Sequence, residues 1–599
     1  MSERAARVVL GTIVGLLVVA ALATDLPAAS DRRFWSDGAT YYAMAASLAR
    51  DFDLRYEAKD LERVRAEYPS GPQGVFLKQG RDGALYYAKA FVYPAAAAPF
   101  VRLLGPSRGL LLTNALSFGL ALILAYRELR LRAAPLVALA AAIVLLLGTA
   151  TPVYLFWYTP EVFNLALVTA GLVAWRRGRP SLSAVLLGLA AYSKPTNLLL
   201  ALPLGVEPLL EHGARGLRES GRRSLVLAAV VVAGFGLTWV ATGEANYQGG
   251  LRKTFYDSYP YESPAATFES TGIWMTTDHL GPLVAGRDDD KQSSRIAPPR
   301  PPSEIRDSFV RNLGYFWTGR FGGALPYFLP AVLAAILFVV AGPRDRPGAL
   351  ALATLLVSYV AYLLIIPDNW YGGGGALGNR YFVNLLPLAL FFLPRGRELW
   401  MAGAGILAML GLLLPMLVSP IAHALRPGAH AVAPAFRAFP LELTMLGDLS
   451  VFTDVWRKRR PYNHPERTDR MPGEATPYYL WFPDDGTYGQ ETSFEEEGFW
   501  LRGGQEAEVV VQALRPIARM SLKLTAGPAG DIVTVRCGRD RRRVVLNTLK
   551  SEALTIDVDE PGLGYYQTYL HRLRFESRVG GASGQDPRPL GTFVVLKLD

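Results

Sequence analysis

The stretch that decides the fold is residues 181–210, SLSAVLLGLAAYSKPTNLLLALPLGVEPLL. It is too long for a single membrane-spanning helix, which needs about 20 mainly apolar residues. Pro195 lies in its middle, lacks a backbone N–H donor and disfavours helical geometry in the residue before it. The stretch is therefore predicted to form two spans that meet in a turn at SKPTN, residues 193–197.

Further apolar runs on both sides indicate a polytopic membrane protein. Of the 599 residues, 51% are hydrophobic and 19% are charged, an apolar excess that excludes an ordinary soluble chain of this length. The first run is longer than the ~7 to 15 residues of a signal-peptide core, so we expect a signal anchor. With the broken stretch counted twice, the chain has about eleven spans. The other runs are residues 8–25, 108–126, 134–150, 161–175, 224–241, 325–341, 349–366, 381–394 and 400–419.

The arginines predict which side of the membrane each loop occupies. The formal charge of +10 comes from short clusters between the apolar runs, a pattern that indicates topology rather than nucleic-acid binding. If the N-terminus is cytoplasmic and the broken stretch counts twice, every cluster falls on the cytoplasmic side of the inner membrane. The clusters are RELRLR at 127–132, RRGR at 176–179, ARGLRESGRR at 214–223, PRDRP at 343–347 and PRGR at 394–397.

The same topology places the bulky segments outside the cytoplasm. These are the loops 27–107, 242–324 and 367–380, and the tail from residue 421. Two long loops and a tail on one face favour a common cavity over separate translocated segments. Cys537 is the sole cysteine, which excludes an intramolecular disulfide and a cysteine-based zinc site.

The tail divides into a linker and a β-rich domain. Residues 421–475 are expected to be the linker, and 476–599 alternate in the manner of a small antiparallel β-sandwich that faces the cell envelope. Its aromatic residues either stack on a sugar ring or form the core, and the core is the commoner role of such side chains. They are Tyr478, Tyr479, Trp481, Phe494 and Trp500.

Two charged residues of the first outer loop are candidates for a site. Asp37, in WSDGATYY, is a turn or helix-cap residue before a helical segment 39–50, or a base at the membrane surface. Lys89, in ALYYAKAFVYPAAAAPF, either snorkels to the interface or contacts a phosphate.

Three further ionisable residues lie where spans begin or end. Glu161, in FWYTPEVFNLAL, is an acid in a first helical turn. Lys194 lies at the turn of the broken pair, and Arg380 follows the glycine run 372–375, which is either a gate or a plain connection. Ionisable residues near membrane depth are costly and indicate function by default.

The order of these residues resembles the GT-C superfamily of integral-membrane glycosyltransferases, particularly its protein O-mannosyltransferase and aminoarabinose-transferase branch. The resemblance rests on Asp37, Lys89 with Pro94, Glu161, SKPTN and NRYFVNLLP, and it covers residues 1–420. Here AFVYP follows the lysine where relatives have proline directly, and the second acid is a glutamate where many have aspartate. The resemblance implies a polytopic GT-C-like fold that transfers a sugar from a polyprenyl-phosphate donor on the outer face.

The resemblance also implies roles for the residues. Asp37 is expected to be the general base, Glu161 to orient the acceptor or to hold Mg²⁺ or Mn²⁺ with Asp37, and basic residues to bind the donor phosphate. The acceptor is a glycan, a lipid or a protein, and membrane lipids are further partners. The expected phosphate-binding residues are Lys89, Lys194 and Arg380, and the expected substrate-binding aromatics are Tyr41, Tyr42, Tyr86, Tyr87, Trp370 and Tyr381.

Two rival classes remain open. A transporter or flippase also has many spans and buried charges, but it predicts ionisable residues in mid-span and repeated halves. A non-catalytic envelope protein would bind glycans through the β-rich domain alone.

Overall fold

The architecture is seen in a computed structural model of the full chain. Of the predicted linker, residues 427, 450–468 and 471–475 fall outside the residues that it describes. The described ranges are 1–34, 37–248, 252–256, 258–274, 283–285, 294–296, 301–341, 345–367, 369–373, 376–426, 428–449, 469–470, 478–513, 515–558, 562–565, 568–583 and 586–598.

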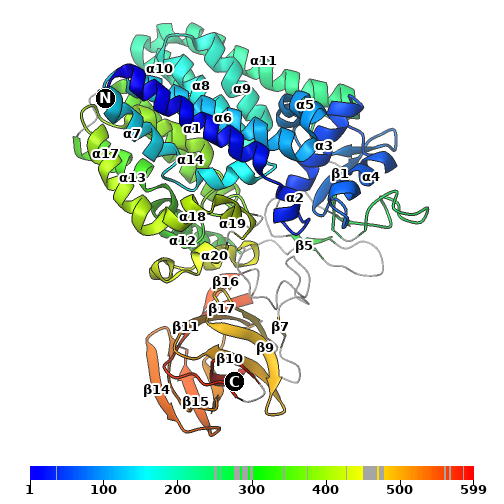
Figure 1. Ribbon diagram of the computed structural model, residues 1–599, viewed down its shortest axis with the longest axis vertical. Coiled ribbons are helices and arrows are strands. Elements are labelled where there is room, and N and C mark those ends of the chain that lie inside the picture. The colour runs from blue at the N-terminus through cyan, green and yellow to red at the C-terminus, as the bar shows by residue number, and fades with distance from the viewer. Residues whose placement is uncertain are drawn as a thin grey trace.

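A body of packed helices forms the larger part of the molecule (Figure 1). Helical segments lie at every predicted run, and in the described part of the chain six are long and apolar enough to cross a membrane. The protein is thus a polytopic helical membrane protein, as predicted. The helices are α1 (Glu3–Ala23), α6 (Pro106–Leu129), α7 (Pro135–Leu146), α8 (Glu161–Arg176), α9 (Pro180–Ser193), α10 (Leu202–His212), α11 (Leu217–Thr242), α13 (Ala324–Ala341), α14 (Arg346–Ile365), α15 (Phe382–Leu385), α16 (Ala389–Phe392), α17 (Glu398–Ala408) and α18 (Leu414–Val418).

The broken stretch folds as two segments. Helix α9 ends at Ser193, and a 3₁₀ segment from Pro195 to Ala201 leads into α10. Helices α10 and α11 then form a hairpin, since Ser220 Oγ donates to Gly205 O at 2.6 Å. The proline break predicted from the sequence therefore separates α9 from α10.

The long loops that the sequence predicts on the outer face hold short helices and a small antiparallel sheet in the order β2-β1-β3-β4. Strand β3 comes from the second long loop and pairs with β1 of the first, with Phe76 opposite Thr254. The two loops are therefore joined into one layer over the helices. The elements are α2 (Leu26–Ala29), α3 (Gly38–Arg50), α4 (Ala58–Glu67), β1 (Val75–Gln79), β2 (Leu85–Tyr87), α5 (Val92–Leu104), β3 (Arg252–Phe255), β4 (Ile273–Trp274), α12 (Pro302–Thr318), α19 (Pro420–Leu425) and α20 (Gly428–Ala431).

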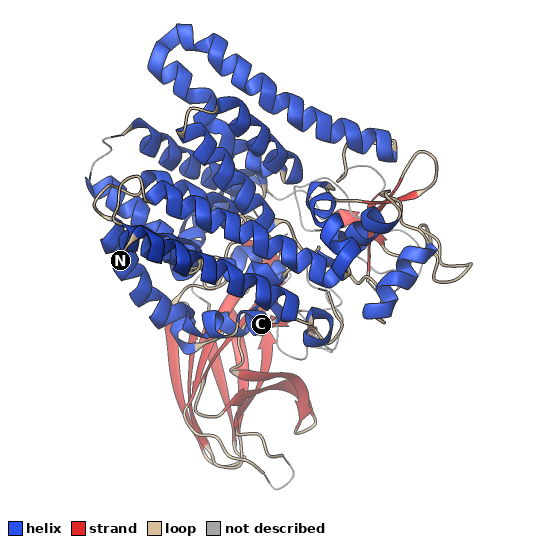
Figure 2. Ribbon diagram, turned by 45° about the horizontal axis from the view of Figure 1, so that its top comes forward, coloured by secondary structure: helices blue, strands red, loops and turns tan. Residues whose placement is uncertain are grey.

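The C-terminal domain consists of two antiparallel sheets that pack face to face (Figure 2). One sheet has the order β15-β12-β18-β10-β9; the other runs β14-β13-β17-β11-β8-β7, with β16 beside β17. The strands are β7 (Asp469–Arg470), β8 (Tyr478–Trp481), β9 (Thr487–Ser493), β10 (Glu496–Arg502), β11 (Glu506–Ala513), β12 (Arg519–Ala526), β13 (Asp531–Cys537), β14 (Asp540–Leu546), β15 (Ser551–Asp557), β16 (Leu563–Tyr565), β17 (Thr568–Ser577) and β18 (Leu590–Leu598).

The aromatic residues of this domain serve mainly as core. Tyr478, Trp481 and Trp500 are buried, which confirms the core interpretation for these three. Phe494 is exposed, because it lies in the β9–β10 turn with φ of 54°. The core interpretation is therefore wrong for Phe494, and the side chain of Tyr479 lies outside the described residues.

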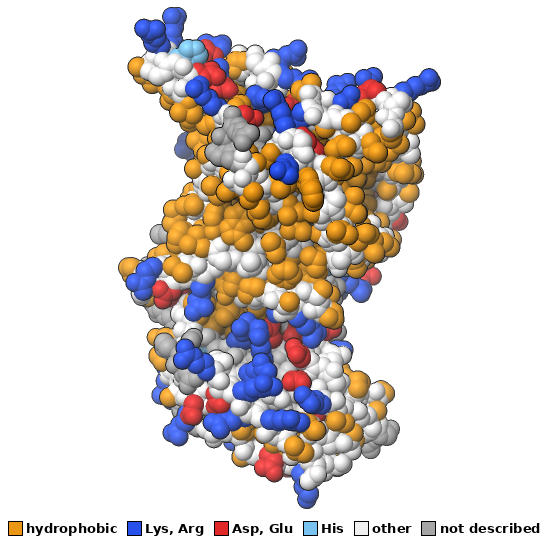
Figure 3. All heavy atoms as spheres, turned by 90° about the vertical axis from the view of Figure 1, so that its left-hand side faces the viewer, with side chains coloured by type: hydrophobic (Ala, Val, Ile, Leu, Met, Phe, Trp, Pro, Cys, Tyr) orange, Lys and Arg blue, Asp and Glu red, His pale blue; other side chains and the backbone are white. Residues whose placement is uncertain are grey.

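Apolar side chains form a broad band across the helical body on the face that Figure 3 shows. Charged side chains gather above it at the tip of the α10–α11 hairpin and below it on the C-terminal domain. This distribution suits a body held in lipid with a polar domain outside it.

Candidate functional site

Asp37 occupies the N-cap position of α3 but does not cap the helix. Its side chain makes no capping hydrogen bond. Instead, Asp37 Oδ2 accepts hydrogen bonds from Lys89 Nζ at 2.9 Å and from Arg380 Nη2 at 3.2 Å. Asp37 therefore lies at the helix-cap position predicted from the sequence, but its carboxylate turns toward two cations from distant parts of the chain.

Glu161 lies on the other side of the same arginine. It is the first residue of α8 and its side chain is 1% exposed. Its Oε1 lies 3.1 Å from Lys194 Nζ and 3.2 Å from Arg380 Nε. Arg380 therefore bridges the two acids, and it joins the four other charged residues predicted from the sequence into one cluster. We call Asp37, Lys89, Glu161, Lys194 and Arg380 the bridged cluster.

Arg252 is a further cation at the site, and sequence reasoning missed it. Lys89 Nζ lies 4.4 Å from the centre of the Phe76 ring and Arg252 Cζ lies 4.6 Å from it. Arg252 is buried and acts electrostatically on Asp37. No local motif marks this arginine, because only the pairing of β3 with β1 brings it to the first loop.

The site carries an excess of positive charge. Lys89, Lys194, Arg252 and Arg380 face two carboxylates. Burial alone would raise the pKa of the Asp37 carboxyl, but Lys89 and Arg380 outweigh it and hold that pKa below its usual range. Burial lowers the pKa of the Lys89 ammonium, and Asp37 opposes this shift. The arrangement suits an anionic ligand that shares the cations with Asp37.

The same geometry does not fit the divalent cation considered for Asp37 and Glu161. Asp37 Oδ2 already contacts Lys89 and Arg380, and Glu161 Oε1 already contacts Lys194 and Arg380. A metal ion between the acids would take the place of the guanidinium and add positive charge to a cationic site. Among the described residues, no group of three or more His, Cys, Asp or Glu side chains offers a metal site.

Two of the expected substrate-binding aromatics lie at the cluster. The Tyr381 ring packs against Lys194, whose Nζ is 4.2 Å from the ring centre. Tyr41 is buried, packs edge-on against Tyr93 and has a raised pKa because of burial and the nearby Asp37.

The other expected aromatics point elsewhere. The Tyr86 hydroxyl donates to Asp82 at 2.7 Å, and Tyr87 packs edge-on against Tyr56. Trp370 is fully buried among other rings. The structure does not bring these three side chains to the bridged cluster, because each packs within its own loop or between helices.

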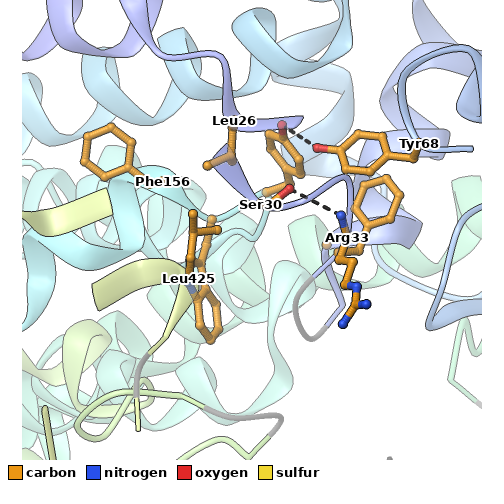
Figure 4. Close-up of a pocket in the computed structure, with 10 residues that line it drawn as sticks. Leu26, Ser30, Arg33, Tyr68, Phe156 and Leu425 are labelled. Carbon is orange, nitrogen blue, oxygen red and sulfur yellow. Dashed lines mark hydrogen bonds between the residues drawn. The ribbon is translucent and has the colours of Figure 1, made fainter. Parts of the chain in front are cut away.

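A small pocket lies beside the base of α3 (Figure 4). Gly38, which follows Asp37, is one of its lining residues, and the others are mostly aromatic. The Tyr158 hydroxyl hydrogen-bonds to Tyr68 at 3.0 Å and to Ser107 at 2.7 Å. Tyr42, the remaining expected aromatic, packs against Tyr68 and Tyr158. The pocket is thus lined by hydrogen-bonded tyrosines and by Gly38, the residue that follows the candidate base Asp37.

Gly372, the first glycine of the run before Arg380, is closely packed. Gly372 has φ of 100°, and a Cβ atom there would lie 2.4 Å from Arg380 Cγ. The backbone N–H of Arg380 donates to Tyr371 O, and that of Gly378 donates to Phe321 O, both at 2.8 Å. Glycine at 372 therefore gives the arginine its position, which is more than a plain connection requires.

Comparison with known proteins agrees with this picture. Residues 88–275, rather less than half of the chain, match the model of glycosyltransferase family 87. The match supports a glycosyltransferase, the class of enzyme that the motif order indicates. A solved structure with some similarity is that of ArnT from Cupriavidus metallidurans bound to undecaprenyl phosphate, at 15% identity and a TM-score of 0.37 over 73% of this chain and 76% of that one. No curated protein matches the chain.

Proposed function

We propose that the protein transfers a sugar from a polyprenyl-phosphate donor to an acceptor on the outer face of the cytoplasmic membrane. The observation that carries the proposal is the bridge of Arg380 between Asp37 and Glu161, with Lys89 beside it. It places a carboxylate and several cations together at helix ends, where a lipid phosphate meets water. We assign the reaction to residues 1–420 and an extracytoplasmic position to residues 476–599.

In the proposed reaction, Asp37 is the general base. Its carboxylate takes the proton of an acceptor hydroxyl, whose oxygen attacks the anomeric carbon of the donor sugar. The bond between that carbon and the phosphate oxygen breaks, and polyprenyl phosphate leaves as an anion. Lys89, Arg252 and Arg380 stabilise the negative charge that develops on the leaving phosphate. Attack from the face opposite the phosphate inverts the anomeric centre.

Donor binding should make Asp37 a better base. Before the donor binds, Lys89 and Arg380 contact the carboxylate and depress its pKa. A phosphate competes for the same two cations because it forms equally strong charge-assisted hydrogen bonds. Once they turn to the phosphate, the carboxylate recovers basicity. The acceptor is then deprotonated only when a donor is in place.

Glu161 is assigned a positioning role. It holds Lys194 and the Nε side of Arg380, which leaves Nη2 of the guanidinium directed to Asp37 and the donor. The nearly complete burial of Glu161 suits a fixed anchor better than a group that contacts a mobile acceptor.

The location of the charges favours transfer over transport. Asp37, Glu161, Lys194 and Arg380 all lie at or just beyond a helix end rather than in mid-span. Helix α8 begins at Glu161 and ends at Arg176, in the arginine cluster expected in the cytoplasm. The bridged cluster therefore belongs to the opposite, outer side.

The test is release of polyprenyl phosphate from polyprenyl-phosphate-linked pentoses and hexoses by the purified protein in lipid nanodiscs. The protein should release it from at least one donor, and Asp37→Asn should lower the rate by about 10² to 10⁴, the usual contribution of a general base. Asp82→Asn, in the same loop but bonded to Tyr86, is the matched control and should keep its rate. Equal release by the wild type and Asp37→Asn would remove Asp37 from catalysis.

A further inference from the structure

A second, polar cleft lies where the helical body meets the C-terminal domain. It encloses about 660 Å³, including the part open to solvent. Arg320, between α12 and α13, and Arg437, after α20, line it from the side of the helical body. The opposite wall is the outer face of the sheet formed by β11, β17 and β13. Figure 1 shows this domain directly beneath α12 and α20.

The strand register gives this wall its polar surface. Successive residues of a strand alternate between faces, so the core positions of β11 and β13 leave Glu508 and Thr534 on the outer face. Arg574 of β17 lies between Glu508 of β11 and Arg536 of β13. Glu576 lies opposite Thr534 on the same face. The cleft floor is thus a grid of acids, arginines and a hydroxyl.

Ion pairs hold the two sides together but leave some groups unused. Arg320 Nη2 lies 2.7 Å from Glu508 Oε2, and Arg437 Nη1 donates to Glu506 O at 2.9 Å. Arg320 is 1% exposed, yet its Nη1 has no hydrogen-bond partner among the described residues.

Two residues of the cleft floor also lack partners for their side-chain polar groups within the described residues. The hydroxyl of Thr534, which is 2% exposed, has no partner in the described part of the chain. Arg536 makes no ion pair with any residue that the structure describes. Buried polar groups are nearly always satisfied in proteins, so Arg320 Nη1 and the Thr534 hydroxyl point to a ligand, and the exposed Arg536 guanidinium adds a donor beside them.

The charge balance of the cleft identifies the class of ligand. Four arginines and four carboxylates line it, so its formal charge is balanced. An anion would be repelled by the acids and a cation by the arginines. Sugar hydroxyls suit both, since each donates to a carboxylate and accepts from a guanidinium.

We propose that this interdomain cleft binds a neutral, polyhydroxylated glycan, and that this glycan is the acceptor chain of the transferase. The role of this glycan as the acceptor rests on the proposed function, whereas the binding of a neutral glycan does not. The aromatic core of the domain plays no part, because Tyr478, Trp481 and Trp500 are buried away from solvent.

The backbone connects the cleft to the bridged cluster. Phe321, next to Arg320, accepts the hydrogen bond from Gly378 N at 2.8 Å, and Arg380 follows two residues later. Both Phe321 N and Gly322 N donate to Glu442 Oε1 at 2.8 Å, which fixes the loop that carries Arg320. A glycan in the cleft therefore lies against the loop that contacts the segment holding the catalytic arginine.

The test is saturation-transfer NMR on the full chain in nanodiscs, without donor. The probes are maltotriose, mannotriose and cellotriose at millimolar concentration, with trigalacturonate as an anionic counterpart. At least one neutral trisaccharide should bind, and Thr534→Val and Arg536→Gln should each raise its Kd about fivefold to tenfold, as the loss of one hydrogen bond requires. Arg519→Gln, an exposed arginine on the other sheet, is the control and should leave Kd unchanged.

The outcomes separate the cleft from the transferase. Asp37→Asn should bind the trisaccharide as the wild type does, because Asp37 is not part of the cleft. If no neutral trisaccharide binds, if only trigalacturonate binds, or if Thr534→Val and Arg536→Gln bind normally while fully folded, the cleft proposal is overturned. Release of polyprenyl phosphate in that case leaves the proposed function standing. If a trisaccharide binds but no donor is turned over, the glycan-binding cleft is supported and the proposed transferase activity is overturned.

Discussion

Arg380 lies 3.2 Å from Asp37 although 343 residues separate them in the sequence. The contact joins the segment before α15 to the start of α3, and the same guanidinium reaches Glu161 at the start of α8. Three segments far apart in the sequence therefore meet in one charged group. The bridge makes the site testable residue by residue.

Lys89 should set the affinity for the donor phosphate. Lys89→Met removes an ammonium that contacts Asp37, so we expect KM for the donor to rise by at least about tenfold, the loss of one charge-assisted hydrogen bond. Lys89→Arg keeps the charge and should recover part of the affinity. Lys59→Met, on an exposed helix of the same loop, is the control. Unchanged KM in Lys89→Met would contradict phosphate binding by Lys89.

Arg252 and Lys253 should behave differently, although they are neighbours on β3. Arg252 shares Phe76 with Lys89, whereas Lys253 Nζ donates to Phe268 O, Glu269 O and Thr271 O on the other face of the strand. Arg252→Gln should raise KM for the donor severalfold with little change in melting temperature. Lys253→Gln should lower the melting temperature and leave KM of the folded enzyme unchanged. The reverse pattern would show that Arg252 is only structural.

Glu161 and Lys194 should be coupled in stability. Removing one partner of a buried ion pair leaves an unpaired charge and costs about 3 to 5 kcal/mol. We expect Glu161→Gln and Lys194→Met each to lower the unfolding temperature in detergent. The double variant should lose less free energy of unfolding than the sum of the two single losses, with a difference of about 1 to 3 kcal/mol in a double-mutant cycle. Additive losses would show that the 3.1 Å contact contributes nothing.

The pH dependence should report the depressed pKa of Asp37. The base is lost only when the pH falls through the pKa of the folded free enzyme, which lies below the usual range because of Lys89 and Arg380. We expect kcat/KM, which reports the free enzyme, to stay level from pH 7 down to about 5. Lys89→Met should move the acid limb upward. A wild-type acid limb above pH 5 that Lys89→Met does not move would exclude Asp37 as its source.

The same shift predicts how Asp37 affects stability. Because its pKa is lower in the folded state, its ionised form stabilises the fold above the unfolded-state value of about 3.9. That contribution is lost as the pH falls through the folded-state pKa. The difference in melting temperature between the wild type and Asp37→Asn should therefore be constant near neutrality and shrink in acid. A difference that grows in acid would contradict the depressed pKa.

Much of the helical body could be predicted from the sequence, because few backbone conformations satisfy their hydrogen bonds within a lipid bilayer. Long apolar runs must become helices, and Pro195 prevents the longest of them from continuing as one. The arginine clusters predict the side of each loop. The meeting of Asp37, Lys89, Glu161, Lys194 and Arg380 could therefore be predicted from motif order and topology.

The directions in which side chains point and the pairing of strands from different loops could not be predicted from the sequence. Nothing local shows that the Asp37 side chain turns away from the helix it precedes, or that Tyr86 turns to Asp82. Arg252 reaches the site only through the pairing of two strands from different loops, and the cleft arginine Arg320 only through the docking of the C-terminal domain. These features depend on contacts between distant segments, which spacing along the chain does not determine.

Gly372 limits how this enzyme can be engineered. Replacing flexible glycines with alanine is an ordinary route to higher thermostability, because it restricts the unfolded chain. At Gly372 the same change would place a methyl group 2.4 Å from Arg380 Cγ. A stabilised variant for biotechnology would therefore have to be sought at glycines such as Gly236, where a Cβ atom meets nothing within 4 Å.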